Sequence, residues 1–521
     1  MITEQTIPIP KTEQAPSDAA VIAKGALVNF LGTMAKIVKS ISFIILTRLF
    51  GPEIFGLYGL AWSIIDLTSK VGHFALDKSI IHFLPRYRED GDTNAIYVLL
   101  SRAFGVGLIM SLLTGIGVFL SAPLLEAQFQ KTGMATMLQI LAPVLPLMSL
   151  TMIILGVTRA HKIMKYDAYI KSIAEPLTMF GMACVLYFMG WHVAGIAAGH
   201  AVALVGSVIF AGFIFSKFYS WRQCFQSLKD FRLWSTMTRF SLPVMGYEVM
   251  YLMMIRLDIL MVGYFLSAME VGIYLIATEI ALSTKKVRQW FDPIFSPIVS
   301  ELAYRKDTQR IGHNFAMVTR WILTINIAFL CGVFLIGEEL LGLFGPEFGI
   351  GFLTMIILAV SHVVYSSMGS GDTILIMSGH PYINLVNTVI VVAVNFGLNV
   401  VLIPKFGMVG AAVGTLVSFS LLTLIRGIEV YRLFRIHPFR WILLKPILSA
   451  TVSFAIAYTT SLRLPDYDVL RMVVPPLLFL GCYGLSLWRM KLEDEDYLVL
   501  ERLFARLRRK NAKKNAWRLS V

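Results

Sequence analysis

Charged side chains interrupt several long apolar stretches of this sequence. Lys36 and Lys39 lie three residues apart in one stretch, and Asp66 and Lys70 lie four apart in the next. Residues four apart share a helix face, so Asp66 and Lys70 suit a local ion pair with the acid N-terminal to the base. Two later apolar stretches carry Glu248, Arg256, Asp258, Glu279, Lys285, Lys286 and Arg288.

The chemistry of these groups depends on whether the stretches cross a lipid bilayer. A charge at the bilayer centre costs roughly 2.5–3.5 kcal/mol on insertion scales, so it faces protein or water. Ammonium and guanidinium groups replace lost water around a phosphate, which favours a cavity for an anionic headgroup. The predicted binding set is Lys36, Lys39, Lys70, Arg256, Lys285 and Lys286.

The acids among these residues have two other interpretations. A carboxylate whose surroundings change with conformation carries a coupling proton or sodium ion, and the sequence does not choose between them. Alternatively, acids and cations neutralise one another as structural ion pairs. The coupling or ion-pair candidates are Asp66, Glu248, Asp258 and Glu279. No other cofactor and no metal site is expected, because Cys184, Cys224, Cys331 and Cys482 lack metal-ligand spacing.

The composition places these charges in a membrane protein. Of 521 residues, 57% are hydrophobic and 15% are charged, whereas soluble domains carry about 25% charge. No polar stretch is long enough to fold as a catalytic domain, so an enzyme is not expected. An all-helical protein is expected, because a backbone in lipid must satisfy its hydrogen bonds internally and a helix of about 20 mainly apolar residues does so. Fourteen segments qualify, at about 25–47, 54–74, 96–121, 134–157, 168–189, 193–216, 238–264, 271–295, 317–341, 350–370, 382–403, 408–431, 442–462 and 469–488.

Lys and Arg predict the orientation of these spans. They concentrate in loops after even-numbered spans, whereas loops after odd-numbered spans hold little beyond Arg48, Lys131, Lys405 and Arg463. By the positive-inside rule, both termini are cytoplasmic, and the protein is a multi-pass protein of the cytoplasmic (inner) membrane. The net charge of +14 is explained by this pattern and by attraction to membrane lipids. No nucleic-acid partner is needed.

Three local matches at nearly one offset indicate an internal duplication. Gly56-Leu57-Tyr58 recurs as Gly272-Ile273-Tyr274, and a Gly-Val-Phe-Leu motif at Gly117 recurs at Gly332. Gly195 and Gly199 recur as Gly410 and Gly414. The shift maps the first six spans onto the next six in the same direction, so two six-helix lobes face each other as parallel repeats. Lys70 then corresponds to Lys286, and Lys39 to Arg256.

The predicted organisation follows from the spans and the duplication. Spans 13 and 14 lie outside the repeat. Three histidines that are isolated in the sequence, His200, His362 and His380, are expected to be satisfied or exposed rather than metal ligands. The predicted regions are a disordered cytoplasmic tail (1–22), an N-terminal lobe (23–217), a basic inter-lobe loop (218–237), a C-terminal lobe (238–432), helices 13 and 14 (433–488) and a basic amphipathic cytoplasmic tail (489–521).

Two motifs carry a family resemblance. The segment TRLFGPEIFGLYGLA (Thr47 to Ala61) and the segment FLPRYRED (Phe83 to Asp90) resemble the polysaccharide-transport, or O-antigen (Wzx-type), flippases of the multidrug/oligosaccharidyl-lipid/polysaccharide exporter superfamily. The resemblance covers nearly all of the chain. It implies movement of an undecaprenyl-pyrophosphate-linked oligosaccharide to the outer leaflet by alternating access, for surface polysaccharide biosynthesis. It also implies a cationic central cavity and, as partners, a polysaccharide polymerase and chain-assembly proteins.

Three rival functions remain open. A lipid II flippase shares the architecture and the need for basic residues. A multidrug exporter of the same superfamily would carry cationic compounds, so it is expected to have an acid-dominated cavity, and twelve spans would suffice for it. The charge balance here leans basic, and two further spans are predicted. An oligosaccharide polymerase or ligase would need a large catalytic outer loop, and the outer loops here are short.

Overall fold

The computed structural model describes residues 37–227, 234–464 and 468–490, together with Asp18, Ile22 and Asp496. Every regular element in these ranges is helical, which confirms the all-helical prediction. The predicted N-terminal tail and C-terminal amphipathic tail lie almost entirely outside the described residues, as does part of the inter-lobe loop. The predicted region boundaries therefore stay predictions.

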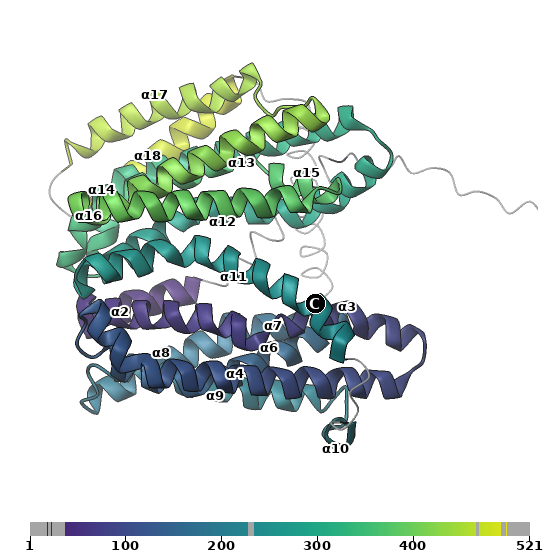
Figure 1. Ribbon diagram of the computed structural model, residues 1–521. Coiled ribbons are helices and arrows are strands. Elements are labelled where there is room, and N and C mark those ends of the chain that lie inside the picture. The colour runs from purple at the N-terminus through teal and green to yellow at the C-terminus, as the bar shows by residue number, and fades with distance from the viewer. Residues whose placement is uncertain are drawn as a thin grey trace, which may run out of the picture.

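Two groups of helices form the molecule, and they lie one above the other in Figure 1. The N-terminal group contains α2 (Ile37–His73), α3 (Leu76–Glu89), α4 (Thr93–Phe129), α5 (Met134–Leu141), η1 (Ala142–Val144), α6 (Leu145–Ala160), α7 (Lys165–Asp167), η2 (Ala168–Ala174), α8 (Glu175–Phe188) and α9 (Gly195–Phe215), followed by the short α10 (Trp221–Gln226).

The second group begins with a helix that also contacts the first. It contains α11 (Trp234–Phe265), α12 (Ala268–Tyr304), α13 (Thr308–Gly342), η4 (Pro346–Gly351), α14 (Phe352–Ser367), α15 (Gly371–Met377) and α16 (Pro381–Phe434). A final pair, η5 (Trp441–Leu443) with α17 (Leu444–Ser461) and α18 (Asp468–Arg489), packs on α13.

Nine helical segments within the described ranges are long and apolar enough to cross a membrane. Three of them contain two helices joined across a kink, and in α13 the kink is at Ile336. In α2 and α16 the kinks are at Gly51 (φ 78°) and Gly407 (φ 59°), in a backbone region that favours glycine because it has no Cβ. Both α2 and α16 contain all or part of two predicted spans. The count of fourteen spans stays a prediction.

Short polar side chains begin two of the long helices that follow loops. Asp92 accepts a hydrogen bond from the backbone N–H of Ala95 (2.8 Å) at the start of α4, and Asp307 accepts one from Arg310 (3.0 Å) at the start of α13. These side chains satisfy backbone donors that a helix leaves free at its first turn. The predicted duplication equates Asp92 with Asp307, by the same offset that relates Gly117 to Gly332.

The ends of the bundle are named here by residues that lie at them. The start of α12 lies at one end, where Gly272 lies against Pro52, next to Gly51, and Glu270 lies beside the kink at Gly407; this is called the Gly51 end. The turn from α3 to α4 at Asp90 lies at the other, the Asp90 end (Figure 1). The two groups meet mainly through α2 and α12, and α11 lies against both α2 and α16. The inner faces of α2, α11 and α12 are therefore where a site between the groups can form.

At the Gly51 end the two groups touch backbone to backbone. A Cβ atom on Gly56 would lie 1.9 Å from the carbonyl oxygen of Ala268, and one on Gly272 would lie 2.1 Å from that of Pro52. Gly56 and Gly272 are the two glycines that the predicted duplication equates. Nearby, Arg48 Nε donates to the carbonyl oxygen of Leu343 (2.6 Å). This contact between α2 and α12 thus depends on glycine at both positions.

The substitution Gly56→Ala is expected to lower the free energy of unfolding by about 1–3 kcal/mol, because a methyl group overlaps a rigid backbone carbonyl. Thermal denaturation of the purified protein in detergent measures this effect. Gly117→Ala in α4 is the control, since no atom lies within 4 Å of the added Cβ and alanine favours the helix. Equal melting temperatures for the two variants would contradict the proposed tight contact.

Candidate functional site

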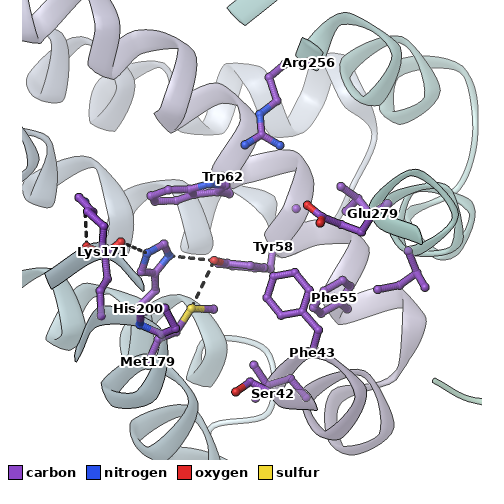
Figure 2. A pocket seen from close by; sticks show the side chains of 16 residues that line it. Ser42, Phe43, Phe55, Tyr58, Trp62, Lys171, Met179, His200, Arg256 and Glu279 are labelled. Atoms are coloured by element: carbon purple, nitrogen blue, oxygen red, sulfur yellow. Dashed lines mark hydrogen bonds and ion pairs between the residues drawn. The ribbon is translucent and has the colours of Figure 1, made fainter. Parts of the chain in front are cut away.

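A cavity of about 210 Å³ lies where α2 and α8 face α11 and α12. Figure 2 shows its polar groups, with Arg256 reaching in from α11 and Glu279 from α12. This cavity, called here the Trp62 cavity, is lined by Ser42, Phe43, Leu46, Phe55, Tyr58, Gly59, Trp62, Lys171, Glu175, Pro176, Met179, His200, Arg256, Leu275, Ile276 and Glu279.

One wall of the cavity is a row of interacting polar side chains from neighbouring helices of the first group. The hydroxyl of Tyr58 lies 2.8 Å from Nδ1 of His200, and Nε2 of His200 lies 4.0 Å from the carboxylate of Glu175. Lys171 Nζ donates to the same carboxylate at 2.8 Å. Lys171 and Glu175 are four residues apart, so helix geometry places them on one face. His200 is buried and hydrogen-bonded, as expected of a satisfied histidine. Its partners come from α2 and α8, which the sequence spacing does not reveal.

Lys171 and Glu175 lie where helix geometry is irregular. Residues Ala168–Ala174 form a π-helix, and α8 begins directly after it with Pro176 near its start. Proline lacks a backbone N–H, so the regular hydrogen bonding of the preceding turn is interrupted. Single π-helical turns inside α-helices are frequent at functional sites. Here the turn places Lys171 at the cavity.

Arg256 and Asp66 form an ion pair between the two groups of helices. Arg256 Nη2 lies 2.9 Å from Asp66 Oδ2, and each side chain is about one-fifth exposed. The expected local pair of Asp66 with Lys70 is therefore wrong: Lys70 Nζ lies 3.4 Å from Glu248 of α11 instead. Asp66 pairs with Arg256 rather than with Lys70 because α11 packs closely along α2 and presents the longer, forked guanidinium.

A second lysine also lies close to Glu248. Lys78 Nζ of α3 lies 3.7 Å from Glu248 Oε1, and the hydroxyls of Ser79 and Ser241 lie 2.6 Å apart where α3 meets α11. These contacts join α2 and α3 to the half of α11 that lies toward the Asp90 end. Of the predicted binding set, Arg256 and Lys70 thus have carboxylate partners in this conformation.

The other predicted cations are spread over different places. Lys285 Nζ lies 5.3 Å from the ring centre of Tyr365 in α14, within cation–π range. Lys286 is its neighbour on α12 and is half-buried with contacts of its own. Lys36 and the side chain of Lys39 lie outside the described residues. Of the described members of this set, Arg256 alone lines the Trp62 cavity.

Asp258 lies in a separate cluster of oxygen-bearing side chains. Its carboxylate accepts hydrogen bonds from Asn399 (2.7 Å), from Tyr274 (3.2 Å) and, closely, from Thr415. A small cavity of about 10 Å³ adjoins it. Among the described residues, Asn399 Oδ1 and the hydroxyl of Ser418 are buried without a hydrogen-bond partner. The cluster is contributed by α11, α12 and α16.

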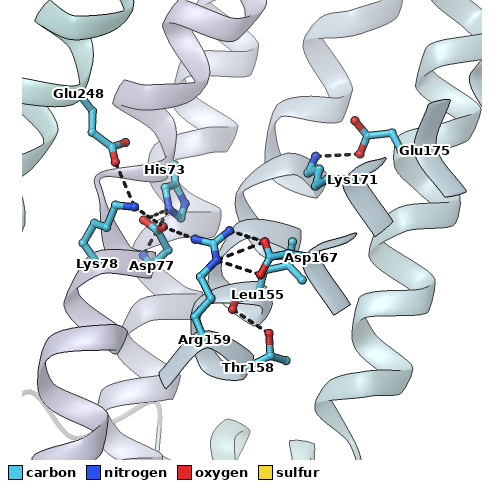
Figure 3. Close-up of polar contacts among 10 residues, drawn as sticks. All are labelled: His73, Asp77, Lys78, Leu155, Thr158, Arg159, Asp167, Lys171, Glu175 and Glu248. Carbon is cyan, nitrogen blue, oxygen red and sulfur yellow. Dashed lines mark hydrogen bonds and ion pairs between the residues drawn. The ribbon is translucent and has the colours of Figure 1, made fainter. Parts of the chain in front are cut away.

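Charged clusters also join helices within each group. Asp77 lies 2.9 Å from His73 and accepts from Arg159 (3.0 Å), and Arg159 also binds Asp167 (Figure 3).

A corresponding cluster lies in the second group. Arg288 binds Asp292 (3.1 Å) and Asp372 (2.6 Å), and Arg426 lies 3.9 Å from Asp372. An offset of 215, which is that of Gly117 and Gly332 in the predicted duplication, equates Asp77 with Asp292. Each group carries a charged cluster that includes one of these two positions.

Sequence reasoning missed most of these partners. Several of these residues lie near the ends of predicted spans, where a charge is common and does not indicate a site. They are Asp77, Arg159, Asp372 and Arg426. The repeat offset was the available signal, because it pairs Asp77 with Asp292. The aromatic residues of the cavity carried no signal beyond composition.

The comparisons with known proteins agree with this architecture. Residues 45–348, more than half of the chain, match the model of a family described as polysaccharide biosynthesis protein. In Haloferax volcanii, the probable low-salt glycan biosynthesis flippase Agl15 is 32% identical over 171 residues, which are 32% of this chain and 36% of that protein. The probable flippase AglR of the same organism is 30% identical over 174 residues, 32% of this chain and 35% of that protein. The chain thus spans about a third of the length of the curated relatives it matches.

Solved structures share the fold at low sequence identity. The lipid II flippase MurJ in an inward closed conformation superposes with a TM-score of 0.72 at 14% identity, over 88% of this chain and 98% of that chain. An inward-facing multidrug resistance MATE family transporter of the MOP superfamily gives 0.61 at 13% identity, over 79% and 98%. These relatives are named as flippases and transporters, not as enzymes. The resemblance seen in Thr47 to Ala61 is confirmed: this chain belongs to the polysaccharide biosynthesis protein family and has the fold of the MOP superfamily.

Proposed function

We propose that this protein flips a polyprenyl-(pyro)phosphate-linked oligosaccharide from the inner to the outer leaflet of the cytoplasmic membrane by alternating access. The observation that carries the proposal is the Trp62 cavity, which lies between two groups of membrane helices and is lined by ionisable side chains from both. A cavity of this kind gives a polar part of the cargo a place that avoids hydrocarbon. Family membership and the relative named as a glycan biosynthesis flippase, Agl15, support a glycan cargo.

The distribution of basic loops supports the direction of insertion. The basic residues near helix ends gather at the Asp90 end, as with Arg159, Arg305 and Arg435, while the Gly51 end has few, such as Arg48 and Lys131. By the positive-inside rule the Asp90 end faces the cytoplasm, and both termini with it. A headgroup then enters at the Asp90 end and leaves at the Gly51 end. A polymerase and chain-assembly proteins would consume the product outside.

The Asp258 cluster is the proposed site of a coupling ion. Hard cations prefer oxygen ligands, and carboxylate, amide and hydroxyl oxygens surround the small cavity beside Asp258. The two buried oxygens that lack partners among the described residues, on Asn399 and Ser418, supply further ligands. The cavity volume of about 10 Å³ matches a single water-sized group. A sodium ion fits this donor set, and a proton on Asp258 is the simpler alternative.

Flipping by the purified, reconstituted protein tests the function. Fluorescent lipid-linked glycans of different lengths are placed in the proteoliposomes, and their exposure on the opposite leaflet is measured with an impermeant quencher. The proposal expects exposure of lipid-linked oligosaccharides only with the protein present. Movement of lipid II alone would favour the rival suggested by the MurJ fold, and movement of soluble cationic dyes alone would favour an exporter.

The double substitution Lys70→Ala with Lys286→Ala is expected to reduce flipping by at least about tenfold, the effect of a lost charge-assisted contact to phosphate. Membrane insertion should be retained, which size-exclusion chromatography of the purified variant checks. Lys78→Ala is the matched control, because Lys78 also contacts Glu248 but is 43% exposed. Unchanged flipping in the double variant would leave both lysines with a structural role.

The isosteric substitution Asp258→Asn is expected to abolish the dependence of flipping on an ion gradient, because it removes the only negative charge of the described cluster. Flipping is measured with a sodium gradient, with a proton gradient and with neither, at equal ionic strength. Glu429→Gln is the control, since Glu429 of α16 is likewise hydrogen-bonded by an asparagine, Asn387 (2.7 Å). Gradient dependence that survives in Asp258→Asn would refute the assignment.

A further inference from the structure

The size of the Trp62 cavity restricts what it holds. Pockets for drug-sized ligands have volumes of about 300–1,000 Å³, whereas this cavity has about 210 Å³. A whole oligosaccharide with its diphosphate does not fit in that space. A single ring-sized group does. The cavity therefore recognises one part of a larger cargo.

The walls of the cavity combine aromatic faces with charged hydrogen-bonding groups. Among the described residues, its aromatic rings all come from α2, apart from the imidazole of His200. Trp62 packs against that imidazole with ring centres 4.1 Å apart and ring planes tilted by 42°. Arg256 and Glu279 enter from the other group of helices (Figure 2). Aromatic faces give a ring an apolar surface to pack against, and a few placed polar groups fix its orientation.

The charge balance argues against a phosphate in this cavity. Among the described residues, the two cations that line it already have carboxylate partners: Lys171 has Glu175 at 2.8 Å, and Arg256 has Asp66 at 2.9 Å. Glu279 is half-buried and, among the described residues, forms no hydrogen bond or ion pair. A phosphate group would meet this uncompensated carboxylate. An organic cation would meet Arg256 and Lys171.

An uncharged polyhydroxylated ring satisfies all of these groups. Its hydroxyls donate to Glu279 and accept from Arg256 or Lys171, while its C–H face packs on Trp62 or Tyr58. We propose that the Trp62 cavity binds one uncharged sugar ring of the glycan, and that the phosphates are held elsewhere along the path. This inference rests on the proposed flippase function and adds a sugar-recognition site to it. Glu279 acts in it as the hydroxyl acceptor.

Ligand-observed saturation-transfer NMR on the full-length protein in nanodiscs tests the proposal. The probes are glucose, galactose, mannose and N-acetylglucosamine, with inorganic pyrophosphate and tetraphenylphosphonium as an anion and a lipophilic cation. At least one sugar is expected to bind wild-type protein. Glu279→Gln is expected to weaken that binding by about tenfold, as for one lost charge-assisted hydrogen bond. Trp62→Leu should weaken it as well.

The controls separate recognition from folding. Glu338→Gln is the matched variant, because Glu338 is an exposed glutamate of α13 that does not line the cavity, and it should bind sugar as wild type does. Glu279→Gln changes little volume and removes no contact to a described residue, so it should fold even if Trp62→Leu does not. Absence of sugar binding, or equal binding in Glu279→Gln, would overturn the proposal. So would pyrophosphate or tetraphenylphosphonium binding that Glu279→Gln alters while sugars do not bind.

The flipping assay distinguishes failure of this inference from failure of the proposed function. Wild-type protein that flips a lipid-linked glycan without binding any sugar probe refutes the sugar site and leaves the flippase function standing. Protein that binds a sugar in a Glu279-dependent manner but flips no lipid-linked glycan refutes the function and leaves the sugar site standing.

Discussion

The cost of placing a charge in hydrocarbon is the constraint on which this structure depends. Each charge within the apolar helices must face a partner or a polar cavity, and here the partners often come from the opposite group of helices. Asp66 binds Arg256, and Lys70 binds Glu248. The same pairs that make these charges tolerable therefore hold the two groups together. Any conformation that separates the groups must provide other partners, and a polar headgroup with its water is one source of them.

Charge pairs within each group have a different consequence. The His73, Asp77 and Arg159 cluster joins α2, α3 and α6, and the cluster around Arg288 and Asp372 joins α12 to α15. Breaking a buried pair by removing one partner is costly, so these clusters keep each group rigid. Between the groups, the described pairs are more exposed. Relative motion of two rigid groups is thus easier than deformation of either one.

How much of this arrangement could be predicted from the sequence depends on the range of each interaction. Hydropathy predicts the helices, because each span must satisfy its backbone internally. Local pairs such as Lys171 with Glu175 follow from helix spacing. Partners from other helices do not: the spacing of Asp66 and Lys70 suits a local pair, and only the packing of α11 shows that both bind elsewhere.

Two further features mark the limits of sequence spacing. His200 gains its partners from the approach of Tyr58 and Glu175, which no local pattern reveals. The predicted repeat offset reaches further than spacing does, since it pairs Asp77 with Asp292 across the two groups. It identifies equivalent positions, but it does not say which residues those positions contact.

Opening at the Gly51 end has its own energetic requirement. There the groups touch through backbone at Gly56 and Gly272, and Arg48 donates to carbonyl oxygens of Gly342 and Leu343 at the end of α13. Terminal carbonyls of a helix have no partners within the helix. If this end opened toward lipid, a guanidinium and these carbonyls would lose their hydrogen bonds in hydrocarbon, whereas water or sugar hydroxyls would replace them. Separation of α2 from α12 is therefore favourable only when a polar group fills the gap between them. Opening of this end is thus linked to the presence of water or polar cargo between the two helices.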